Sequence, residues 1–398
     1  MTKNAKVLYI TYNGVGESIF QSQVLPYLKG LSEKGYDITL LSYERDGKAS
    51  PAQEKTLNDA NIKWHKLRYH KSPRVLATFY DFMLGAVASF SIALKHKINI
   101  IHARATHGAI IGFLTVKILR KKFIFDTRGL DSEEYVDGGM IKKNSLLHKI
   151  VFMLEKYLFS QSDSIVLLSH NARALLEEKG LGEYLKKTDT EVIPCVTDLD
   201  LFKYYGEKTV GQKNNIKFIY TGSIGTWYML DEMLDFFKVA REKLTNATFD
   251  IFTQSNKSVI DEKIKKLNID SFVKTGYVDH DSVPDRLRAS DAGVCFIKAV
   301  SSKRASSPTK IGEYLACGLP VVINSGVGDI EGIIRDNGVG VVIEGFDKVH
   351  YEKALADLRA LLEDKDISRR CRQAAERHFS LNDAINKYDI IYGNLTKS

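Results

Sequence analysis

The segment 306–322, SSPTKIGEYLACGLPVV, carries the densest set of residues that could bind an anion. Pro308 and Thr309 suit a helix start, because proline tolerates a missing amide there and threonine can cap the helix. The free backbone amides of such a start attract an anion such as a pyrophosphate, and Lys310 adds a point charge beside them. Glu313 follows one turn later, where its carboxylate can accept hydrogen bonds from ribose hydroxyls. The alternative is a purely structural helix-to-strand unit.

Polar residues also follow two apolar runs in the first half of the chain. Arg104 and His107 follow INIIHA, and Asp126 and Arg128 lie at the end of KFIFDT. The carboxylate of Asp126 can orient or deprotonate an acceptor hydroxyl, and Arg128 can hold a phosphate with two hydrogen bonds. We therefore predict catalytic roles for Asp126 and Arg128, with Arg104 and His107 as further acceptor-binding candidates. A structural role for each residue stays open.

A short loop with two glycines follows the first apolar run. Gly14 and Gly16 would let the backbone approach an anion closely. The loop is not a dinucleotide fingerprint, because the G-x-G-x-x-G pattern would need glycine where Ile19 stands. A plain tight turn is the alternative.

The elements that must position these residues alternate along the chain. Short, continuous, β-branched apolar runs predict buried strands over 6–11, 36–43, 98–103, 122–127 and 164–169, and again over 216–222, 248–253, 272–278, 292–297, 320–324 and 340–344. Amphipathic stretches between them predict helices over 20–33, 107–119, 146–159, 229–244, 258–267, 283–289 and 309–316, and two or three more over 351–363, 368–379 and 381–396. This alternation predicts two parallel sheets with right-handed crossovers, whose ligands bind at the carboxyl ends of the strands.

The segment 306–322 resembles the signature of GT-B glycosyltransferases of the large retaining family 4, also called group 1. The family pattern places two glutamates eight positions apart around the helix start. Glu313 matches the second glutamate, and Ala305 stands at the position of the first. The resemblance implies that Glu313 meets the nucleotide ribose. The first glutamate of the family contacts the donor sugar, and Ala305 cannot take that role.

Further segments resemble the family in the expected order, so the resemblance covers nearly the whole chain: 191–202, 219–234, 278–297 and 327–343. It implies that Gly222 and Ser223 form a loop at the donor phosphates, and that the loop with Gly14 and Gly16 faces them. Trp227 and Tyr228 stand where the family usually has a basic pair that grips the diphosphate. We expect the charge to come from Lys298, Lys303, Arg304 and Lys310, of which Lys303 and Lys310 are predicted donor contacts and Lys310 a catalytic residue.

The resemblance implies an α/β fold of the GT-B type, with two Rossmann-like doubly wound parallel-sheet domains facing a central cleft. We assign 1–195 to an acceptor-binding domain, 196–215 to a linker and 216–380 to a nucleotide-sugar-binding domain. The C-terminal helix at about 381–398 is expected to pack back on the first domain.

We expect no metal and no cofactor. Asp198-Leu199-Asp200 spells the DxD motif that holds a metal in GT-A glycosyltransferases, but here it lies in the predicted linker. The four cysteines lack the close spacing of zinc sites, and no signal peptide is evident at the N-terminus, which together indicate a cytoplasmic protein.

The charge is unevenly distributed. The net charge is +8, and residues 1–190 carry 28 basic against 19 acidic residues. A basic surface attracts anionic lipid headgroups, lipid phosphates or nucleic acid. No RNP, KH or helix-turn-helix pattern accompanies it, so we expect no nucleic-acid partner but a peripheral contact of the first domain with an anionic membrane, at its inner face.

The basic and aromatic stretch 63–74 fits either that membrane surface or a solvated strand edge and loop. The apolar stretch 75–94 has about the length of a membrane span, but Asp81 lies inside it. We expect an amphipathic or buried domain helix.

The sequence predicts a retaining, metal-independent glycosyltransferase. It would move a sugar from a nucleotide-diphosphate donor to a saccharide or lipid-linked acceptor, in surface polysaccharide or glycolipid assembly. Three alternatives stay open: a sugar-nucleotide epimerase on the same fold, a non-catalytic sugar or lipid binder, and a basic nucleic-acid binder.

Overall fold

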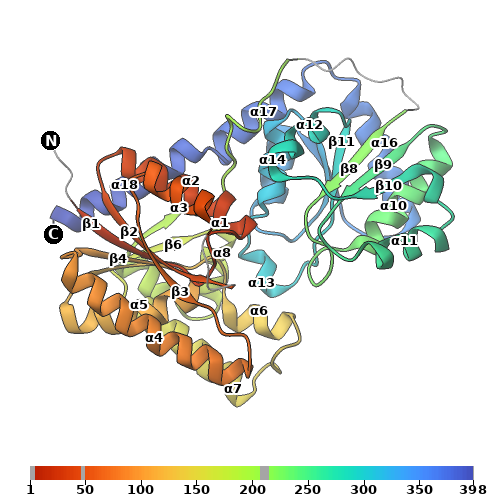
Figure 1. Cartoon of the computed structure of the whole chain (residues 1–398). Coiled ribbons are helices and arrows are strands. Elements are labelled where there is room, and N and C mark those ends of the chain that lie inside the picture. The colour runs from red at the N-terminus through yellow and green to blue at the C-terminus, as the bar shows by residue number, and fades with distance from the viewer. Residues whose placement is uncertain (1–4, 46–49, 207–214, 398) are drawn as a thin grey trace. The chain divides into compact units, whose positions relative to one another are not determined.

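The chain forms two compact units in a computed structural model that describes residues 5–45, 50–206 and 215–397 (Figure 1). Unit 1 comprises Met1–Pro194 and Leu381–Ser398, and unit 2 comprises Cys195–Ser380. Of the predicted linker 196–215, the part over 207–214 lies outside the described residues, and 196–206 belongs to unit 2.

Unit 1 is a seven-stranded sheet in the order β3-β2-β1-β4-β5-β6-β7, and every neighbouring pair is parallel. Its strands are β1 Lys6–Ile10, β2 Asp37–Glu44, β3 Lys63–Arg68, β4 Ile100–Arg104, β5 Lys122–Asp126, β6 Ser164–Leu167 and β7 Asp189–Val192. Its helices are α1 Ser18–Gln23, α2 Leu25–Glu33, α3 Pro51–Asp59, α4 Arg74–Lys95, α5 Ala105–Leu119, α6 Asp131–Asp137, α7 Leu146–Ser160, α8 His170–Glu178, α9 Gly182–Lys187 and α18 Leu381–Lys397.

Unit 2 is a six-stranded, all-parallel sheet in the order β10-β9-β8-β11-β12-β13. Its strands are β8 Lys217–Thr221, β9 Thr248–Phe252, β10 Val273–Gly276, β11 Ala292–Cys295, β12 Val321–Asn324 and β13 Gly340–Ile343. Its α-helices are α10 Leu230–Lys243, α11 Lys257–Lys266, α12 Val283–Arg288, α13 Ser301–Arg304, α14 Thr309–Ala316, α15 Ile330–Asn337, α16 Lys348–Leu362 and α17 Ile367–His378. Both sheets are doubly wound, which confirms the predicted pair of Rossmann-like folds.

Two local features differ from the sequence prediction. The helix predicted over 20–33 is interrupted at Val24, whose φ of −134° is not helical, and α2 begins again with proline in its first turn. Pro26 accounts for the interruption, because proline lacks the amide that a continuing helix needs and its ring clashes with the carbonyl group four residues earlier. The edge strands β3 and β7 were not predicted as buried strands. Residues 63–68 form an edge strand, which is the second of the two interpretations given for the stretch 63–74.

The C-terminal helix α18 packs on unit 1, beside α2 (Figure 1). Ala384, Ile385, Tyr388, Ile391 and Tyr392 are buried at the spacing of one helix face. The Tyr36 hydroxyl donates a hydrogen bond to the carboxylate of Asp389 at 2.6 Å, which ties α18 to the residue before β2. Side chains from the end of the chain thereby enter the core of unit 1.

A glycine brings α5 against the central strands of unit 1. A Cβ atom added at Gly108 would lie 2.7 Å from the carbonyl oxygen of Ile10 in β1, which is closer than van der Waals contact. Since that neighbour is backbone and not a flexible side chain, it cannot move aside cheaply. The close approach holds the beginning of α5, which carries His107, at the end of β1.

We therefore expect Gly108→Ala to destabilise the protein by about 1–3 kcal/mol, measured by urea unfolding, because overpacking a rigid contact strains the fold. Gly393→Ala is a matched control in another helix of the same unit, where an added Cβ meets nothing within 4 Å. That substitution should stabilise by about 0.5–1 kcal/mol through helix propensity. Equal effects of the two substitutions would show that α5 does not make this contact.

Candidate functional site

The strand order places a candidate site on each unit. In a doubly wound sheet, ligands bind outside the carboxyl ends of the strands where the strand order reverses. That position lies between β1 and β4 in unit 1 and between β8 and β11 in unit 2. The predicted residues Arg104 and Asp126 end β4 and β5, and Gly222 directly follows β8.

Lys310 is the central charged residue of the site on unit 2. It lies in the first turn of α14, and its side chain is buried between aromatic residues. Its Nζ donates a hydrogen bond to the Tyr220 hydroxyl at 2.9 Å and lies 3.4 Å from the centre of the Tyr228 ring. Burial lowers the pKa of Lys310 to about 8. Among the described residues no carboxylate lies within ion-pair distance of Lys310. Its ammonium group contacts aromatic faces, and the charge of Glu313 acts on it from one turn along α14.

The loop after β8 lies directly against this lysine. Gly222 has a φ of +123°, a conformation that favours glycine, and a Cβ there would lie 2.8 Å from the Nζ of Lys310. The amide of Thr221 donates a hydrogen bond to the buried Tyr314 hydroxyl of α14 at 2.8 Å. Gly222 and Ser223 are both exposed. The structure thus brings together the glycine loop and the helix start that the sequence predicted as phosphate contacts.

A second lysine of unit 2 has a similar environment. Lys303 on α13 is buried, and its Nζ lies 4.1 Å from the centre of the Trp227 ring. Trp227 and Tyr228, which stand where the related family has a basic pair, therefore each contact a lysine from elsewhere in the unit. Lys298 is exposed, and Arg304 is half-buried.

Glu313 lies one turn along α14 from Lys310, and its side chain is 13% exposed. Its Oε1 is 3.9 Å from the Nε2 of His280, and the hydrogen bond and negative charge of Glu313 raise the pKa of that histidine. Thr309 is half-buried at the helix start. Ala305, at the position of the missing glutamate, is buried at the end of α13.

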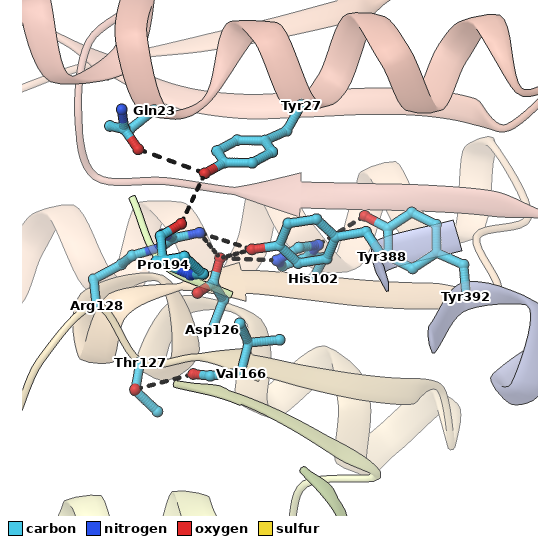
Figure 2. Close-up of polar contacts among 10 residues, drawn as sticks. All are labelled: Gln23, Tyr27, His102, Asp126, Thr127, Arg128, Val166, Pro194, Tyr388 and Tyr392. Atoms are coloured by element: carbon cyan, nitrogen blue, oxygen red, sulfur yellow. Dashed lines mark hydrogen bonds and ion pairs between the residues drawn. The ribbon is translucent and has the colours of Figure 1, made fainter. Parts of the chain in front are cut away.

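In unit 1, Asp126 is the centre of a buried polar network (Figure 2). Its Oδ2 accepts hydrogen bonds from Arg128 at 2.7 Å and from the Tyr388 hydroxyl at 2.9 Å, and lies 3.3 Å from the Nε2 of His102. The Nδ1 of His102 lies 2.7 Å from the Tyr392 hydroxyl. Two of these partners, Tyr388 and Tyr392, come from α18. The last helix of the chain is thereby linked by hydrogen bonds to residues of β4 and β5.

The network determines which groups are charged. Burial would raise the pKa of Asp126, but the Arg128 guanidinium and the hydrogen bond from His102 outweigh it and hold the pKa well below its usual range. Burial lowers the pKa of His102 more than Asp126 raises it. A neutral His102 can then donate from Nε2 to Asp126 and accept at Nδ1 from Tyr392.

This geometry bears on the acceptor roles predicted for Asp126 and Arg128. Asp126 is fully buried and its Oδ2 is engaged, so an acceptor hydroxyl cannot reach that oxygen without a rearrangement. Within the described chain, Asp126 Oδ1 and Nη1 of both Arg104 and Arg128 have no protein hydrogen-bond partner. These atoms keep hydrogen-bonding capacity at the ligand-binding edge, and the predicted acceptor contacts stay predictions.

His107 lies in the first turn of α5 and is more accessible than Asp126. Its ring stacks on Tyr12 with a centroid distance of 5.2 Å, and its Nδ1 lies 3.7 Å from the Asp131 carboxylate. The side chain is 30% exposed. Tyr12 follows β1 and Asp131 begins α6, so this cluster gathers the loop after β1 and the first turns of α5 and α6 at the carboxyl edge of the sheet.

The loop with Gly14 and Gly16 has partners inside unit 1. The amide of Val15 donates to the buried carboxylate of Glu44 at 3.0 Å, and the amide of Gly14 donates to Glu17 at 3.3 Å. Carboxylates of the same unit thus bind two backbone amides of this loop, and one of them is the amide of the predicted residue Gly14. A phosphate contact at Gly14 and Gly16 stays a prediction.

The DxD motif has a local structural role, since Asp198 Oδ1 accepts hydrogen bonds from the amides of Asp200 and Leu201 at 2.9 and 3.1 Å. Over the described ranges, no group of three or more His, Cys, Asp or Glu side chains has the arrangement of a metal site.

Several residues of the two sites were not identified as site residues from the sequence alone. They are Tyr220, Tyr314 and His280 on unit 2, and Tyr27, His102, Tyr388 and Tyr392 on unit 1. A buried histidine preceding Arg104 in β4 was the one available signal for the unit 1 network, because histidine inside an apolar strand needs a partner.

Replacing Asp126 tests the network. Asp126→Asn should destabilise the protein by about 3–5 kcal/mol in urea unfolding, because it leaves the Arg128 charge buried without its counter-ion. Since the pKa of Asp126 is depressed in the folded state, the difference from wild type should be complete above about pH 4 and shrink as the pH falls below that value.

Asp37→Asn is a matched control, because Asp37 also pairs with a basic residue, Lys63, but at the surface. This substitution should lower the free energy of unfolding by less than about 1 kcal/mol. Equal losses for the two variants would contradict a buried, paired Asp126.

The chain matches two family models and many solved structures. The model described as Glycosyl transferases group 1 matches residues 206–378, and the model described as Glycosyltransferase Family 4 matches residues 22–201. No curated protein matches the chain in a sequence search.

Three solved structures illustrate the similarity of fold. A sucrose-phosphate synthase from Thermosynechococcus elongatus aligns with a TM-score of 0.74 and 14% identity over 99% of this chain and 100% of its own. HepE from Anabaena, in complex with UDP, aligns with a TM-score of 0.70 and 15% identity over 98% and 100%. WaaG, a glycosyltransferase involved in lipopolysaccharide biosynthesis, aligns with a TM-score of 0.65 and 14% identity over 97% and 99%.

The two family models divide the chain much as the two sheets do, and both sheets have the strand order of a Rossmann-like fold. The chain is therefore a glycosyltransferase of the GT-B fold, of the group 1 and family 4 type.

Proposed function

We propose that the protein transfers a sugar from a nucleoside-diphosphate donor held by unit 2 to a saccharide or lipid-linked acceptor held by unit 1. The observation that carries this proposal is Lys310, buried without an ion pair at the start of α14 and covered by the glycine loop at Gly222. A buried cation at a helix start, where several amides lack partners, is a site for a diphosphate.

The chemistry follows from this placement. Negative charge develops on the diphosphate as the bond to the sugar breaks, and Lys310, Lys303 and the backbone amides at Thr309 and Gly222 would stabilise it. We propose that these fixed charges replace a metal ion. Glu313 would accept hydrogen bonds from the ribose hydroxyls.

Retention of the anomeric configuration is part of the proposal and rests on the family resemblance. No side chain was identified from the sequence as an enzymic nucleophile. We therefore favour attack by the acceptor on the face of the sugar from which the diphosphate leaves. NMR of the product tests this step, and an inverted linkage would reject it.

The donor class has support from a similar protein. HepE from Anabaena has been crystallised with UDP and with UDP-glucose. We propose a nucleotide sugar of this kind for the present chain, used for a surface polysaccharide or glycolipid at the cytoplasmic face of a membrane. The basic first half of the chain supports a contact with anionic lipid.

A sugar-nucleotide epimerase is the second candidate, because a putative UDP-N-acetylglucosamine 2-epimerase from Listeria monocytogenes shares the fold with a TM-score of 0.63. An epimerase would convert the nucleotide sugar with no acceptor present. Incubating the protein with the donor alone, followed by NMR of the sugar, distinguishes the two reactions.

A thermal-shift panel with UDP, GDP, ADP, CMP and their common sugars tests the donor site. One nucleoside diphosphate should raise the melting temperature, because a ligand that binds only the folded state stabilises it. The shift should be the same with EDTA and with Mg²⁺, and it should shrink or disappear in Glu313→Ala. If no nucleotide shifts the wild type, the transferase proposal fails and a non-catalytic binder takes its place.

The pH dependence of binding tests Lys310 directly. A diphosphate favours the protonated lysine, so affinity should be constant between about pH 7 and 8, where both partners are charged. Above the lysine pKa of about 8 the affinity should fall by up to about tenfold per pH unit, because binding then requires uptake of a proton.

Isothermal titration of the identified nucleoside diphosphate from pH 7 to 10 measures this slope. Lys310→Met should bind about 10–100-fold more weakly and lose the slope, since a charged hydrogen-bond partner is removed. Lys298→Met, at an exposed lysine of the same unit, should keep the slope. An affinity of wild type that does not change over this range would exclude Lys310 as the phosphate contact.

A further inference from the structure

One face of unit 1 exposes an unusual number of large apolar side chains. They lie on α4, α5 and α7: Val75, Leu76, Phe79, Tyr80, Met83, Val87, Leu94, Leu114, Ile118, Leu146, Leu147, Ile150, Met153 and Tyr157. In the described part of unit 1, the other exposed large apolar residues are Ile19, Met140 and Ile390. We call this surface the α4–α5–α7 face. Monomeric soluble proteins rarely expose a contiguous apolar area of this kind.

The three helices lie side by side on the same side of the sheet (Figure 1). Ser89 of α4 and Thr115 of α5 share a hydrogen bond of 2.8 Å, and the rings of Phe113 in α5 and Tyr157 in α7 pack at 5.3 Å. The exposed residues on α7 recur at 146, 150, 153 and 157, which is the spacing of one helix face. The apolar residues therefore form one surface and are not scattered.

Helix α4 is held in unit 1 by its other face. By length and composition, Val75–Lys95 is the single helix of the described chain that could cross a membrane. However, Asp81 is fully buried and accepts hydrogen bonds from the Tyr12 hydroxyl and the His70 amide at 2.9 and 3.0 Å. Ser89 is also buried against α5. A helix held in the unit by these groups would lie parallel to the bilayer surface. It would present its outer face to the membrane and would not span the membrane.

The charges on this face have one sign. The three helices contain two carboxylates, Asp81 and Glu155, and both are buried. Four lysines on the same helices are exposed, namely Lys95, Lys117, Lys149 and Lys156, and Lys142 and Lys143 are exposed just before α7. An apolar surface with lysines and no exposed carboxylate complements a bilayer whose headgroups are anionic.

We infer that the α4–α5–α7 face docks on the surface of an anionic lipid bilayer, with the apolar side chains inserted at the headgroup boundary and the lysines at the phosphates. Phe82 of α4 packs against His107 and Tyr12 at the carboxyl edge of the sheet, at 5.7 and 5.8 Å. The docking surface and the candidate acceptor residues are therefore neighbours. Resting on the proposed function, this assigns the acceptor to the lipid-linked class.

Vesicle flotation tests the inference with the full-length protein. Wild type should float with vesicles of phosphatidylglycerol and phosphatidylcholine, and much less with phosphatidylcholine alone. The double variant Phe79→Asp/Met153→Asp should partition at least tenfold less, because it places charges in the inserted surface. Lys149→Gln and Lys156→Gln should each weaken binding about fivefold at low salt, as expected for one lysine at an anionic surface.

The matched control is Val259→Asp/Val349→Asp, which alters two exposed apolar residues of unit 2 and should float as wild type does. All variants replace exposed side chains, so their melting temperatures should stay near that of wild type. Their response to the nucleoside diphosphate identified for wild type should also persist, which separates lipid docking from the donor site.

Three results would overturn the inference. The first is a wild-type protein that does not float with anionic vesicles. The second is a Phe79→Asp/Met153→Asp variant that floats as well as wild type. The third is a wild-type protein that does not bind vesicles and sediments as a dimer, together with a Phe79→Asp/Met153→Asp variant that sediments as a monomer. That result would make the face an interface between two copies of the chain. A protein that floats as expected but transfers no sugar would reject the proposed function and leave the docking surface in place.

Discussion

Parallel strand pairing is the constraint on which both units depend. Every neighbouring pair in the two sheets is parallel, so all strands of a unit end at the same edge and each return crosses through a helix. Residues far apart in sequence, such as Arg104 and Asp126 or Gly222 and Lys310, consequently meet without any direct sequence signal. The same pairing puts the first turns of the helices at this edge, where their free amides face a ligand.

The two sites deal differently with a buried charge. Asp126 is surrounded by an arginine, a histidine and a tyrosine, so its charge is already compensated and its position is determined by the fold. Lys310 contacts a hydroxyl and aromatic rings, and burial reduces its affinity for the proton. A charge without a counter-ion gains more from an incoming anion than a paired charge does. Unit 2 therefore has the larger electrostatic gain available from a diphosphate.

The central strands could be predicted from the sequence, and the edges of the first sheet could not. Strands such as β4 and β12 are buried on both sides and appear as continuous apolar runs. Strands β3 and β7 form the two edges of unit 1, where partial exposure admits KWHKLR and DTEV, sequences with no apolar run. Pro26 is a sequence signal for the helix break at Val24. The break was not predicted, because the amphipathic pattern continues on both sides of the proline.

Site residues were predictable where local position determines them. Lys310 and Glu313 follow from the helix start, and Asp126 follows from the end of a strand. The surroundings of these residues were not predictable, because Tyr388 and Tyr392 are more than 260 residues from Asp126, and Tyr220 is 90 residues from Lys310. Whether a carboxylate near a strand end is accessible depends on such distant partners.

The position of α18 also affects how the protein is made. A ribosome completes the first 194 residues of unit 1 early, then synthesises all of unit 2, and only then releases the helix that carries Tyr388 and Tyr392. Until that moment Asp126 and Arg128 lack the Tyr388 hydroxyl, which forms hydrogen bonds with both of them. The first unit to emerge is thus the last to be finished, and a nascent chain must keep it soluble while the second unit folds.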